Sequence, residues 1–298
     1  MDVRQQDPTG ASGHPGFRRI DALGFAALWV RDVPLCDLSF DNVGQVYDPW
    51  VWLGQVAAVT TAIALTTGAI VLPLRHPLHV AKAAASADRL SGVRFVLSIA
   101  SGVRPVDFPA FGVDYEAHGE RFAESYSVLV QALEGGFPHI ASPLSHMPGA
   151  NLIPKPVGQL PIQVVGSARQ TVQWIAAQAD GRVACPRDEA AQQDRTGLWR
   201  RALDQRAPGH AKPFTQSLFI DLAEDAGATP ISLGRRLGRN RLIEKLLILQ
   251  RLGVHHVTFN LRLSRRPAAD VAEELTAEVL PHFPAATASR GMWSRTWS

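Results

Sequence analysis

Three places in this sequence bring small or polar residues to the end of an apolar, strand-like run. Such residues leave the backbone open to a flat ring, and a serine hydroxyl beside exposed N–H groups can bind an anion. Together they predict a shallow pocket for a planar, phosphorylated cofactor. The three places are Gly68-Ala69, Ala100-Ser101-Gly102 and Gly166-Ser167.

The third of these places is followed directly by a helix-like stretch, Ala168 to Ala179, with Arg169 in its first turn. A helix N-terminus exposes N–H groups and the positive end of the helix dipole, so a hydroxyl and an arginine there can form a phosphate site. The alternative is an ordinary helix start in which Ser167 is the N-cap. The spacing alone leaves both interpretations open.

Strand-like and helix-like stretches alternate along the chain and would position these residues. The alternation is typical of parallel strands joined by crossover helices, and the number of units fits an α/β fold of the TIM type, a (β/α)8 barrel. In that fold the active site lies at the C-terminal ends of the strands. Strands are predicted over Phe25–Asp32, Ile63–Leu72, Arg94–Ala100, Pro161–Val165, Gly181–Cys185, Phe214–Asp221 and His256–Leu261. Helices are predicted over Pro49–Ala62, His76–Leu90, Ala117–Glu134, Ala168–Ala179, Asp188–Gln205, Asn240–Leu252 and Pro267–Leu280.

The N-terminal residues do not supply the eighth strand that a closed barrel needs. Residues 1–17 are polar and rich in glycine and proline, and the following FRRIDALG is interpreted as the end of a helix. We therefore expect a disordered tail over 1–17, a barrel domain over 18–284 without a recognisable first strand, and a C-terminal tail over 285–298. A truncated N-terminus or a misassigned start is the hypothesis for the gap, which would leave two unpaired strand edges.

Composition and charge narrow the class of protein. The 298 residues are 46% hydrophobic and 19% charged, which is typical of a globular protein with a sizeable core. The net charge is +3, and the basic residues are scattered apart from one short run, Arg235, Arg236, Arg239 and Arg241. We interpret this run as a solvated helix face rather than a nucleic-acid site. Two cysteines offer neither a disulfide framework nor metal-ligand spacing. No apolar run has the length of a membrane span. We expect a cytoplasmic protein that binds no metal, nucleic acid or membrane.

Two long segments of the sequence resemble the bacterial luciferase-like group of flavin-dependent oxidoreductases. They are TGAIVLPLRHPLHVAKAAASADRLSG (67–92) and RFVLSIASGVRPVDFPAFGVDYEAHGERF (94–122). PIQVVGSARQTVQWIAAQADG (161–181) continues the likeness, and LWVRDVP (28–34) is similar to a subgroup of uncharacterised luciferase-type oxidoreductases. The resemblance covers about residues 20–284.

The resemblance implies a TIM-type barrel that binds FMN, or in one branch a deazaflavin, at its C-terminal mouth. A non-proline cis peptide bond under the flavin ring maps to Gly68–Ala69. Other flavin contacts map to Ala100 and Ser101, and phosphate contacts map to Gly166, Ser167, Arg169 and Gln170.

A catalytic histidine that luciferases carry after the second strand has no counterpart in this sequence. Arg31 and Asp32 occupy its neighbourhood. Asp32 could serve as a catalytic base, and Arg31 could hold an anionic substrate or the flavin. The alternative is structural, with the two residues paired to each other or to Arg187.

The function implied by the resemblance is that of a flavin-dependent monooxygenase, in which reduced FMN and O2 oxygenate a small organic substrate. Reduced FMN would come from a separate flavin reductase, and the family's mode of association implies a homodimer. One alternative is a deazaflavin-dependent hydride-transfer oxidoreductase. Another is a barrel that has lost catalysis together with its first strand. The long loop Gly135–Leu160 is either a substrate lid or a surface excursion.

Overall fold

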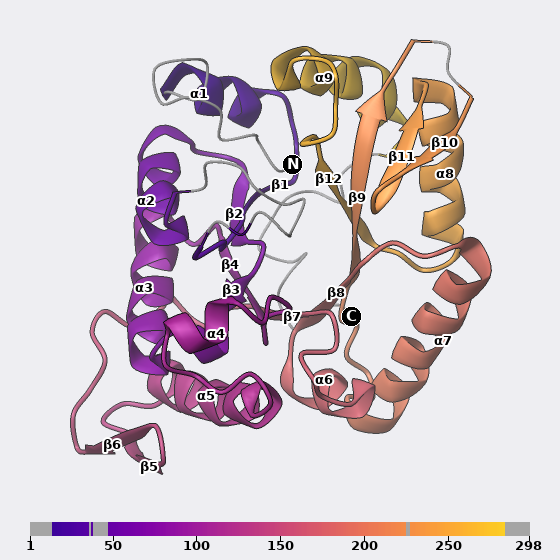
Figure 1. Cartoon of the computed structure of the whole chain (residues 1–298). Helices are drawn as coiled ribbons and strands as arrows, with labels where there is room; N and C mark the ends of the chain where they lie inside the picture. The colour runs from indigo at the N-terminus through magenta and orange to yellow at the C-terminus, as the bar shows by residue number, and fades with distance from the viewer. Residues whose placement is uncertain (1–13, 36, 38–46, 225–226, 284–298) are drawn as a thin grey trace.

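A parallel sheet curls around a central axis and is surrounded by helices, as Figure 1 shows. The computed structural model describes residues 14–35, 37, 47–224 and 227–283. Neighbouring strands of the barrel are parallel throughout, which confirms the predicted TIM-type α/β architecture. Their order is β1 (Ala27–Val30), β2 (Ala64–Thr67), β4 (Phe95–Ala100), β7 (Ile162–Val165), β8 (Gly181–Ala184), β9 (Phe214–Leu222) and β12 (His256–Asn260).

The helices that connect these strands cover the outer face of the barrel (Figure 1). Several begin at a side chain that accepts a backbone N–H, such as Asp48 before α2 and Asp188 before α7. The helices are α2 (Pro49–Val59), α3 (Pro77–Leu90), α5 (His118–Glu134), α6 (Val172–Gln178), α7 (Glu189–Arg206), α8 (Arg239–Arg251) and α9 (Ala268–Glu274), which continues through a π turn (Leu275–Val279) into a 3-10 turn (Leu280–His282).

The eighth position of the barrel falls between β1 and β12. Among the described residues, β1 pairs with β2, β12 pairs with β9, and no strand lies between the two. Most of the expected disordered tail, residues 1–13 of 1–17, lies outside the described residues. FRRIDALG is largely helical, as predicted, in α1 (His14–Ala22). The expected tail boundary at residue 17 falls inside this helix. Phe17 is buried against Trp52, with ring centroids 5.1 Å apart, and so belongs to the folded domain.

Successive side chains along each strand point alternately to the outside and to the inside of the barrel, and each side has its own apolar cluster. The outward-facing ones pack under the helices and form the main core. The inward-facing Ala27, Trp29 and Val183 form a second, smaller cluster inside the barrel. Trp29 also stacks on His256 across the eighth position, with ring centroids 6.2 Å apart. Burial lowers the pKa of His256 to about 4, so this imidazole is neutral at physiological pH.

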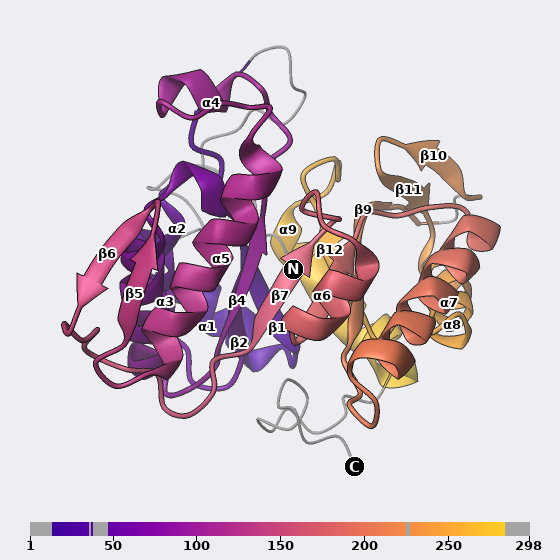
Figure 2. The same cartoon turned by 90° about the horizontal axis from the view of Figure 1, so that it is seen from below.

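Two connections differ from the predicted elements. The run Ile63–Leu72 is divided into β2 and the short β3 (Ile70–Val71), which is followed by a 3-10 turn (Leu72–Leu74). The loop after Gly135 contains an antiparallel hairpin, β5 (His139–Ser142) and β6 (Ser145–Pro148). Figures 1 and 2 show this hairpin on the outer side of α3 and α5. Its position is that of a surface excursion rather than of a lid over the barrel.

The basic run near residue 235 does not form one helix face, so that prediction was wrong. Arg235 and Arg236 lie in β11 (Gly234–Leu237), which pairs with β9 and with β10 (Thr229–Ile231). Only Arg239 and Arg241 of this run lie in α8. Gly234 is required in the hairpin, because a Cβ there would lie 1.8 Å from the carbonyl oxygen of Phe219.

Asp21, at the end of α1, joins this helix to the start of β2. Its carboxylate accepts the backbone N–H groups of Thr61 (2.7 Å), Ala62 (3.0 Å) and Ile63 (2.7 Å). Burial alone would raise the pKa of Asp21, but these hydrogen bonds outweigh burial and lower it. The ionised carboxylate therefore stabilises the folded chain.

Replacing Asp21 by alanine removes the acceptor of three backbone N–H groups. We expect the free energy of unfolding to fall by about 1–3 kcal/mol at pH 7, measured by urea denaturation. Because the folded-state pKa is lowered, this contribution is present above the ordinary aspartate pKa and is lost as the pH falls through the lowered value. The difference between the two proteins should therefore shrink below about pH 4. The exposed Asp204→Ala serves as control, with an effect within about 0.5 kcal/mol. An equal loss in both variants would contradict the role of Asp21.

Candidate active site

The C-terminal ends of the barrel strands open between two connecting segments. Figure 2 shows α4 (Asp107–Ala110) and the β10–β11 hairpin at the same end of the barrel, on opposite sides. We call this end the mouth. Because β2, β4 and β7 are neighbours in the sheet, the three predicted groups of cofactor residues lie side by side there. These residues are Gly68, Ala69, Ala100, Ser101, Gly166, Ser167, Arg169 and Gln170.

The peptide bond between Gly68 and Ala69 is cis, as the resemblance implied. The N–H of Gly68 donates to the carbonyl oxygen of Val30 at 2.6 Å, which continues the β1–β2 pairing to the mouth. A Cβ on Gly68 would lie 3.3 Å from Cε3 of Trp29, tighter than ordinary packing. The absence of a side chain at position 68 therefore makes room for the indole of Trp29, in addition to leaving space in the predicted pocket.

Strand β2 carries two threonines where a buried strand usually has bulky apolar residues. Their hydroxyl groups contact Ser98 of β4. The hydroxyl of Thr67 donates to the carbonyl oxygen of Ser98 (2.7 Å) and accepts its N–H (2.8 Å). The hydroxyls of Thr66 and Ser98 lie 3.2 Å apart. Backbone pairing of β2 with β4 ends at Thr66, so these contacts hold the two strands together beyond that point.

The end of β4 turns sharply after Ala100 and Ser101. Ser101 is buried and Ala100 half-buried. Gly102 has φ +89°, and a Cβ there would lie 2.8 Å from the ring of Phe108 and 2.9 Å from Val71. Glycine is the residue that accepts both the left-handed backbone and this close approach.

The loop after β7 differs from the predicted helix start. Helix α6 begins at Val172, and its N-cap is Thr171 rather than Ser167. Gly166, Ala168 and Arg169 all have positive φ, so the chain makes a left-handed turn here that the sequence did not reveal. The side chains of Ser167 and Arg169 are exposed, and Ser167 Oγ accepts the N–H of Arg169 at 3.3 Å.

The same loop is attached to the N-terminus of α5. The side-chain amide of Gln170 donates to the carbonyl oxygens of Gly119 (2.9 Å) and Ala168 (3.3 Å). Its N–H donors are therefore used within the protein. Arg169 Nε donates to His118 Nε2 at 3.2 Å. A guanidinium can only donate, so Nε2 accepts and the other ring nitrogen, Nδ1, carries the proton that it donates to the Tyr115 carbonyl oxygen.

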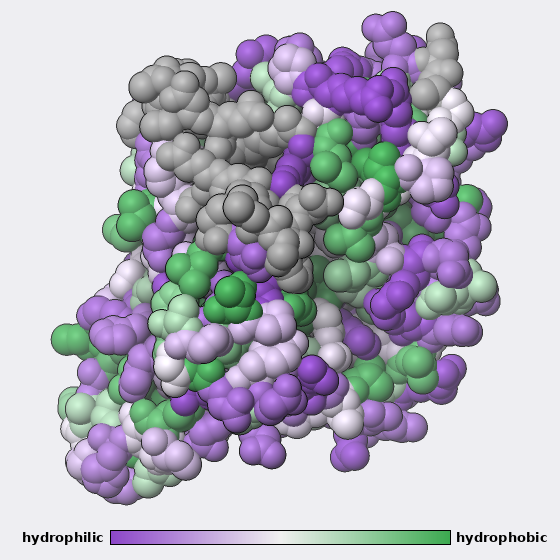
Figure 3. All heavy atoms as spheres, in the orientation of Figure 1, coloured by the Kyte–Doolittle hydropathy of each residue, from purple (hydrophilic) through white to green (hydrophobic). Residues whose placement is uncertain are grey.

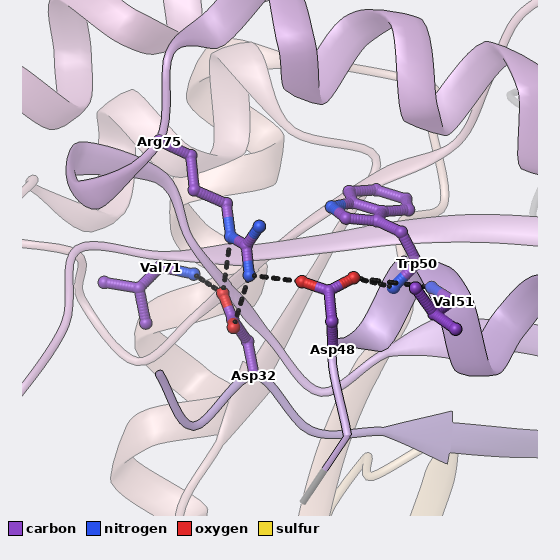
Figure 4. A network of polar contacts seen from close by, with 6 residues as sticks. All are labelled: Asp32, Asp48, Trp50, Val51, Val71 and Arg75. Carbon is purple, nitrogen blue, oxygen red and sulfur yellow. Dashed lines mark hydrogen bonds and ion pairs between the residues drawn. The ribbon is translucent and has the colours of Figure 1, made fainter. Parts of the chain in front are cut away.

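Asp32 is held in a structural network at the end of β1 (Figure 4). Its side chain is 1% exposed and accepts Nε (3.1 Å) and Nη2 (2.8 Å) of Arg75 and the N–H of Val71 (3.1 Å). Arg75 Nη2 also donates to Asp48 at 3.1 Å, and Asp48 caps α2. Burial alone would lower the pKa of Arg75, but the bonds to Asp32 and then to Asp48 raise it. Among the described residues the ion partner of Asp32 is thus Arg75, not Arg31 or Arg187, and its carboxylate accepts three hydrogen bonds.

Asp107 is a buried carboxylate near the mouth that sequence analysis missed. It is 3% exposed and lies at the start of α4, with Oδ1 3.6 Å from Nη2 of the buried Arg104. Burial raises the pKa of Asp107; Arg104 opposes the shift, and the charges of Asp32 and Asp37 add to it. Its position three residues after an arginine, just beyond a predicted strand end, was the signal available in the sequence.

Metal and membrane sites were sought in the described part of the chain. Residues 14–35, 37, 47–224 and 227–283 contain no group of three or more histidine, cysteine, aspartate or glutamate side chains placed to hold a metal ion. None of the helices described there has the length and apolar character needed to cross a membrane.

Comparison with known proteins gives a family match over most of the chain. Residues 16–228 match the profile of the family described as luciferase-like monooxygenase. The 4-hydroxyprotoasukamycin monooxygenase of Streptomyces nodosus subsp. asukaensis is 29% identical over 196 residues, 63% of this chain and 51% of the relative. The chain spans about half the length of the curated relatives it matches.

Solved structures share the fold at low sequence identity. An F420-dependent secondary alcohol dehydrogenase, in complex with an F420–acetone adduct, aligns with a TM-score of 0.75 at 13% identity, over 95% of this chain and 99% of that one. The oxygenating constituent of 3,6-diketocamphane monooxygenase from the CAM plasmid of Pseudomonas putida, in complex with FMN, aligns with a TM-score of 0.70 at 13% identity, over 94% and 98%. At such identity these two likenesses show the fold alone.

The Asp32–Arg75 pair predicts strong coupling in stability. Arg75→Met leaves a buried carboxylate without its cation, so the free energy of unfolding should fall by about 3–5 kcal/mol in urea denaturation. The double variant Asp32→Asn/Arg75→Met should lose less than the sum of the two single losses. Arg241→Met, which breaks the exposed pair with Glu244, is the matched control and should change stability by about 0.5 kcal/mol or less. Additive losses in the double variant would show that the pair does not act as a unit.

Proposed function

The chain belongs to the luciferase-like monooxygenase family, and we propose that it is a flavin-dependent monooxygenase that uses reduced FMN and O2 on a small organic substrate. The observation that carries this proposal is the grouping at the mouth. Three adjacent strands end there in small residues, and an exposed serine and arginine lie at one side of the group. A phosphorylated flavin needs both: an open surface for its flat ring and, next to it, donors for its phosphate.

The residues present fit a phosphorylated flavin. Gly68, Ala69 and Ala100 would leave room for the ring, with Ser101 beside it. In the left-handed turn after β7, Gly166, Arg169 and Gln170 donate their N–H groups within the fold, so the successive N–H groups of Ser167 and Ala168 are the ones that would bind the anion. The exposed Ser167 and Arg169 would add a hydroxyl and a charged donor to the phosphate.

The flavin, when bound and reduced, would supply the electrons and the reaction with O2; the chain would position the reactants and handle protons. Asp32 already accepts three hydrogen bonds from Arg75 and Val71, so its expected catalytic role is not the one we propose. Asp107 is the better candidate to hold a proton near the mouth, because burial raises its pKa. Its Oδ1 atom is buried without a hydrogen-bond partner within the described residues.

A second candidate function is hydride transfer with a deazaflavin. It is favoured by the residues after β1, where Arg31 and Asp32 stand in place of the histidine found in luciferases, so peroxyflavin chemistry lacks that group. A fold likeness to an F420-dependent dehydrogenase is compatible with it. For the FMN reaction, a separate flavin reductase would supply the reduced cofactor, and we expect the chain to act as a homodimer.

The first test is anaerobic titration of the purified chain with reduced FMN and, in parallel, with the reduced deazaflavin, followed by admission of air. We expect saturable FMN binding and a transient absorbance from an oxygen adduct. Tighter binding of the deazaflavin with no oxygen adduct would favour hydride transfer. Binding of neither cofactor by the folded chain would favour a barrel that has lost catalysis.

The phosphate contacts predict a selective loss of affinity. Ser167→Ala combined with Arg169→Ala should weaken FMN binding by roughly 1–3 kcal/mol, the scale of lost charge-assisted hydrogen bonds. Riboflavin lacks the phosphate, so its affinity should not change in the same variant. Arg241→Ala, on the outer helix α8, is the control for loss of a surface charge. Equal losses for FMN and riboflavin would remove these residues from the phosphate site.

A further inference from the structure

Two arginines from different connections meet on one buried carboxylate at the far side of the mouth. Asp221, the penultimate residue of β9, is 3% exposed. Its Oδ2 atom lies 3.8 Å from Nε of Arg236 in β11 and 3.4 Å from Nε of Arg265, which follows β12. Its Oδ1 atom accepts the backbone N–H of Arg265 at 3.0 Å.

The arrangement leaves most of the guanidinium donors unused. The Asp221 carboxylate pairs with the Nε atom of each group, and neither guanidinium has a further hydrogen bond or ion pair among the described residues. The side chain of Arg236 is 32% exposed and that of Arg265 is 72% exposed. Two guanidiniums against one carboxylate leave a net positive charge, and both remain accessible to an anion.

The position of the pair is fixed by the sheet. Arg236 is in register with Asp221 in the parallel β9–β11 pairing, so the two side chains lie on the same face. Gly234 brings the hairpin into close contact with β9 at Phe219. Arg265 is held through its own backbone N–H. Both Nε atoms lie within 4 Å of the same oxygen, so the two guanidiniums are neighbours at this carboxylate.

Apolar side chains are exposed beside the arginines. Leu233, between β10 and β11, is 52% exposed, and Leu263, after β12, is 38% exposed. Across the mouth, Val106 and Phe111 next to α4 are each 46% exposed. Figure 3, which looks at this end of the molecule, shows green apolar residues beside purple hydrophilic ones in the region of β9 and β11. A ligand that satisfies both features has a charged head and an apolar body.

We propose that Arg236 and Arg265, held by Asp221, form a second anion site at the mouth that binds the head group of an amphiphilic organic acid, and that this acid is the substrate. The site lies after β9 and β12, whereas the residues proposed for the flavin phosphate follow β7. That the bound acid is a substrate rests on the proposed function; that the arginines bind an anion does not. Asp221 acts as a positioning residue, since it touches the arginines and not the ligand.

The test uses the full chain without flavin and three probes of equal chain length: octanoate, octyl phosphate and the neutral 1-octanol. Isothermal titration should show saturable binding of the two anions and at least about ten-fold weaker binding of octanol, the scale of one charge-assisted hydrogen bond. Arg236→Gln and Arg265→Gln should each weaken anion binding by a similar factor and leave octanol unchanged. Anion affinity should also fall with rising salt.

Matched variants separate this site from general effects of charge. Arg239→Gln removes an exposed arginine two residues beyond the hairpin, paired with Glu278 at 4.0 Å, and should leave all three affinities unchanged. Asp221→Asn keeps an acceptor for the N–H of Arg265 but loses the charge that orients the guanidiniums, so anion binding should weaken while the melting temperature reports whether the fold is retained. Equal affinity for octanoate and octanol, no binding of either anion, or an equal loss in Arg239→Gln would overturn the proposal.

A titration of the double variant with FMN distinguishes failure of this site from failure of the proposed function. FMN titrated in the Arg236→Gln/Arg265→Gln variant should bind as it does in the unaltered chain, because its phosphate is assigned to the loop after β7. A loss of FMN affinity in that variant would mean that the arginines bind the cofactor phosphate, and would overturn their assignment to a substrate. Normal octanoate binding by a chain that binds no flavin would leave the anion site standing and reject the monooxygenase.

Discussion

A buried carboxylate needs a counter-charge, and the way Asp32 obtains one organises the β1–β4 side of the mouth. Within the described residues its ion partner is Arg75, which lies beyond β3 and also reaches Asp48 at the start of α2. The cis Gly68–Ala69 bond lies between β2 and β3, so the chain on both sides of it is anchored. Val71, which donates to Asp32, pairs with Ala100 of β4, and this connects the network to the next strand end of the predicted cofactor pocket. A loss of this one pair would loosen three connections at once.

Sequence analysis located most of this architecture because apolar periodicity and turn residues are local signals. The strands and helices appear within a few residues of their expected bounds where one interior face dictates the pattern. The partner of Asp32 could not be found in this way, since Arg75 is 43 positions away and Arg31 is adjacent. The start of α6 was misplaced because Ala168 and Arg169 adopt left-handed backbone that their residue types do not announce. The β10–β11 hairpin was missed because its strands are short and its arginines suited a helix face.

Charge is distributed unevenly around the mouth, and this asymmetry restricts what can bind. On the side of β1 and β4, Asp32 and Asp48 share Arg75, and Asp107 lies 3.6 Å from Arg104. On the side of β9 and β12, the two arginines on Asp221 have donors to spare. An anionic group that enters the mouth would meet three carboxylates on the first side and two partly or largely exposed guanidiniums on the second.

Burial is the main cause of the raised pKa of Asp107, and the charges of Asp32 and Asp37 add to it. A carboxyl group so placed takes up a proton more readily than an exposed one, and it lies on the side of the mouth opposite Arg236 and Arg265. An amphiphilic acid held by Arg236 and Arg265 would then extend its apolar body toward α4, over the ends of β2 and β4. The part of the substrate nearest the proposed flavin would be its uncharged part, and the oxidisable carbon would be remote from the acid group. The charge pattern thus supports a reaction at the apolar portion of the substrate, with the acid group serving for orientation.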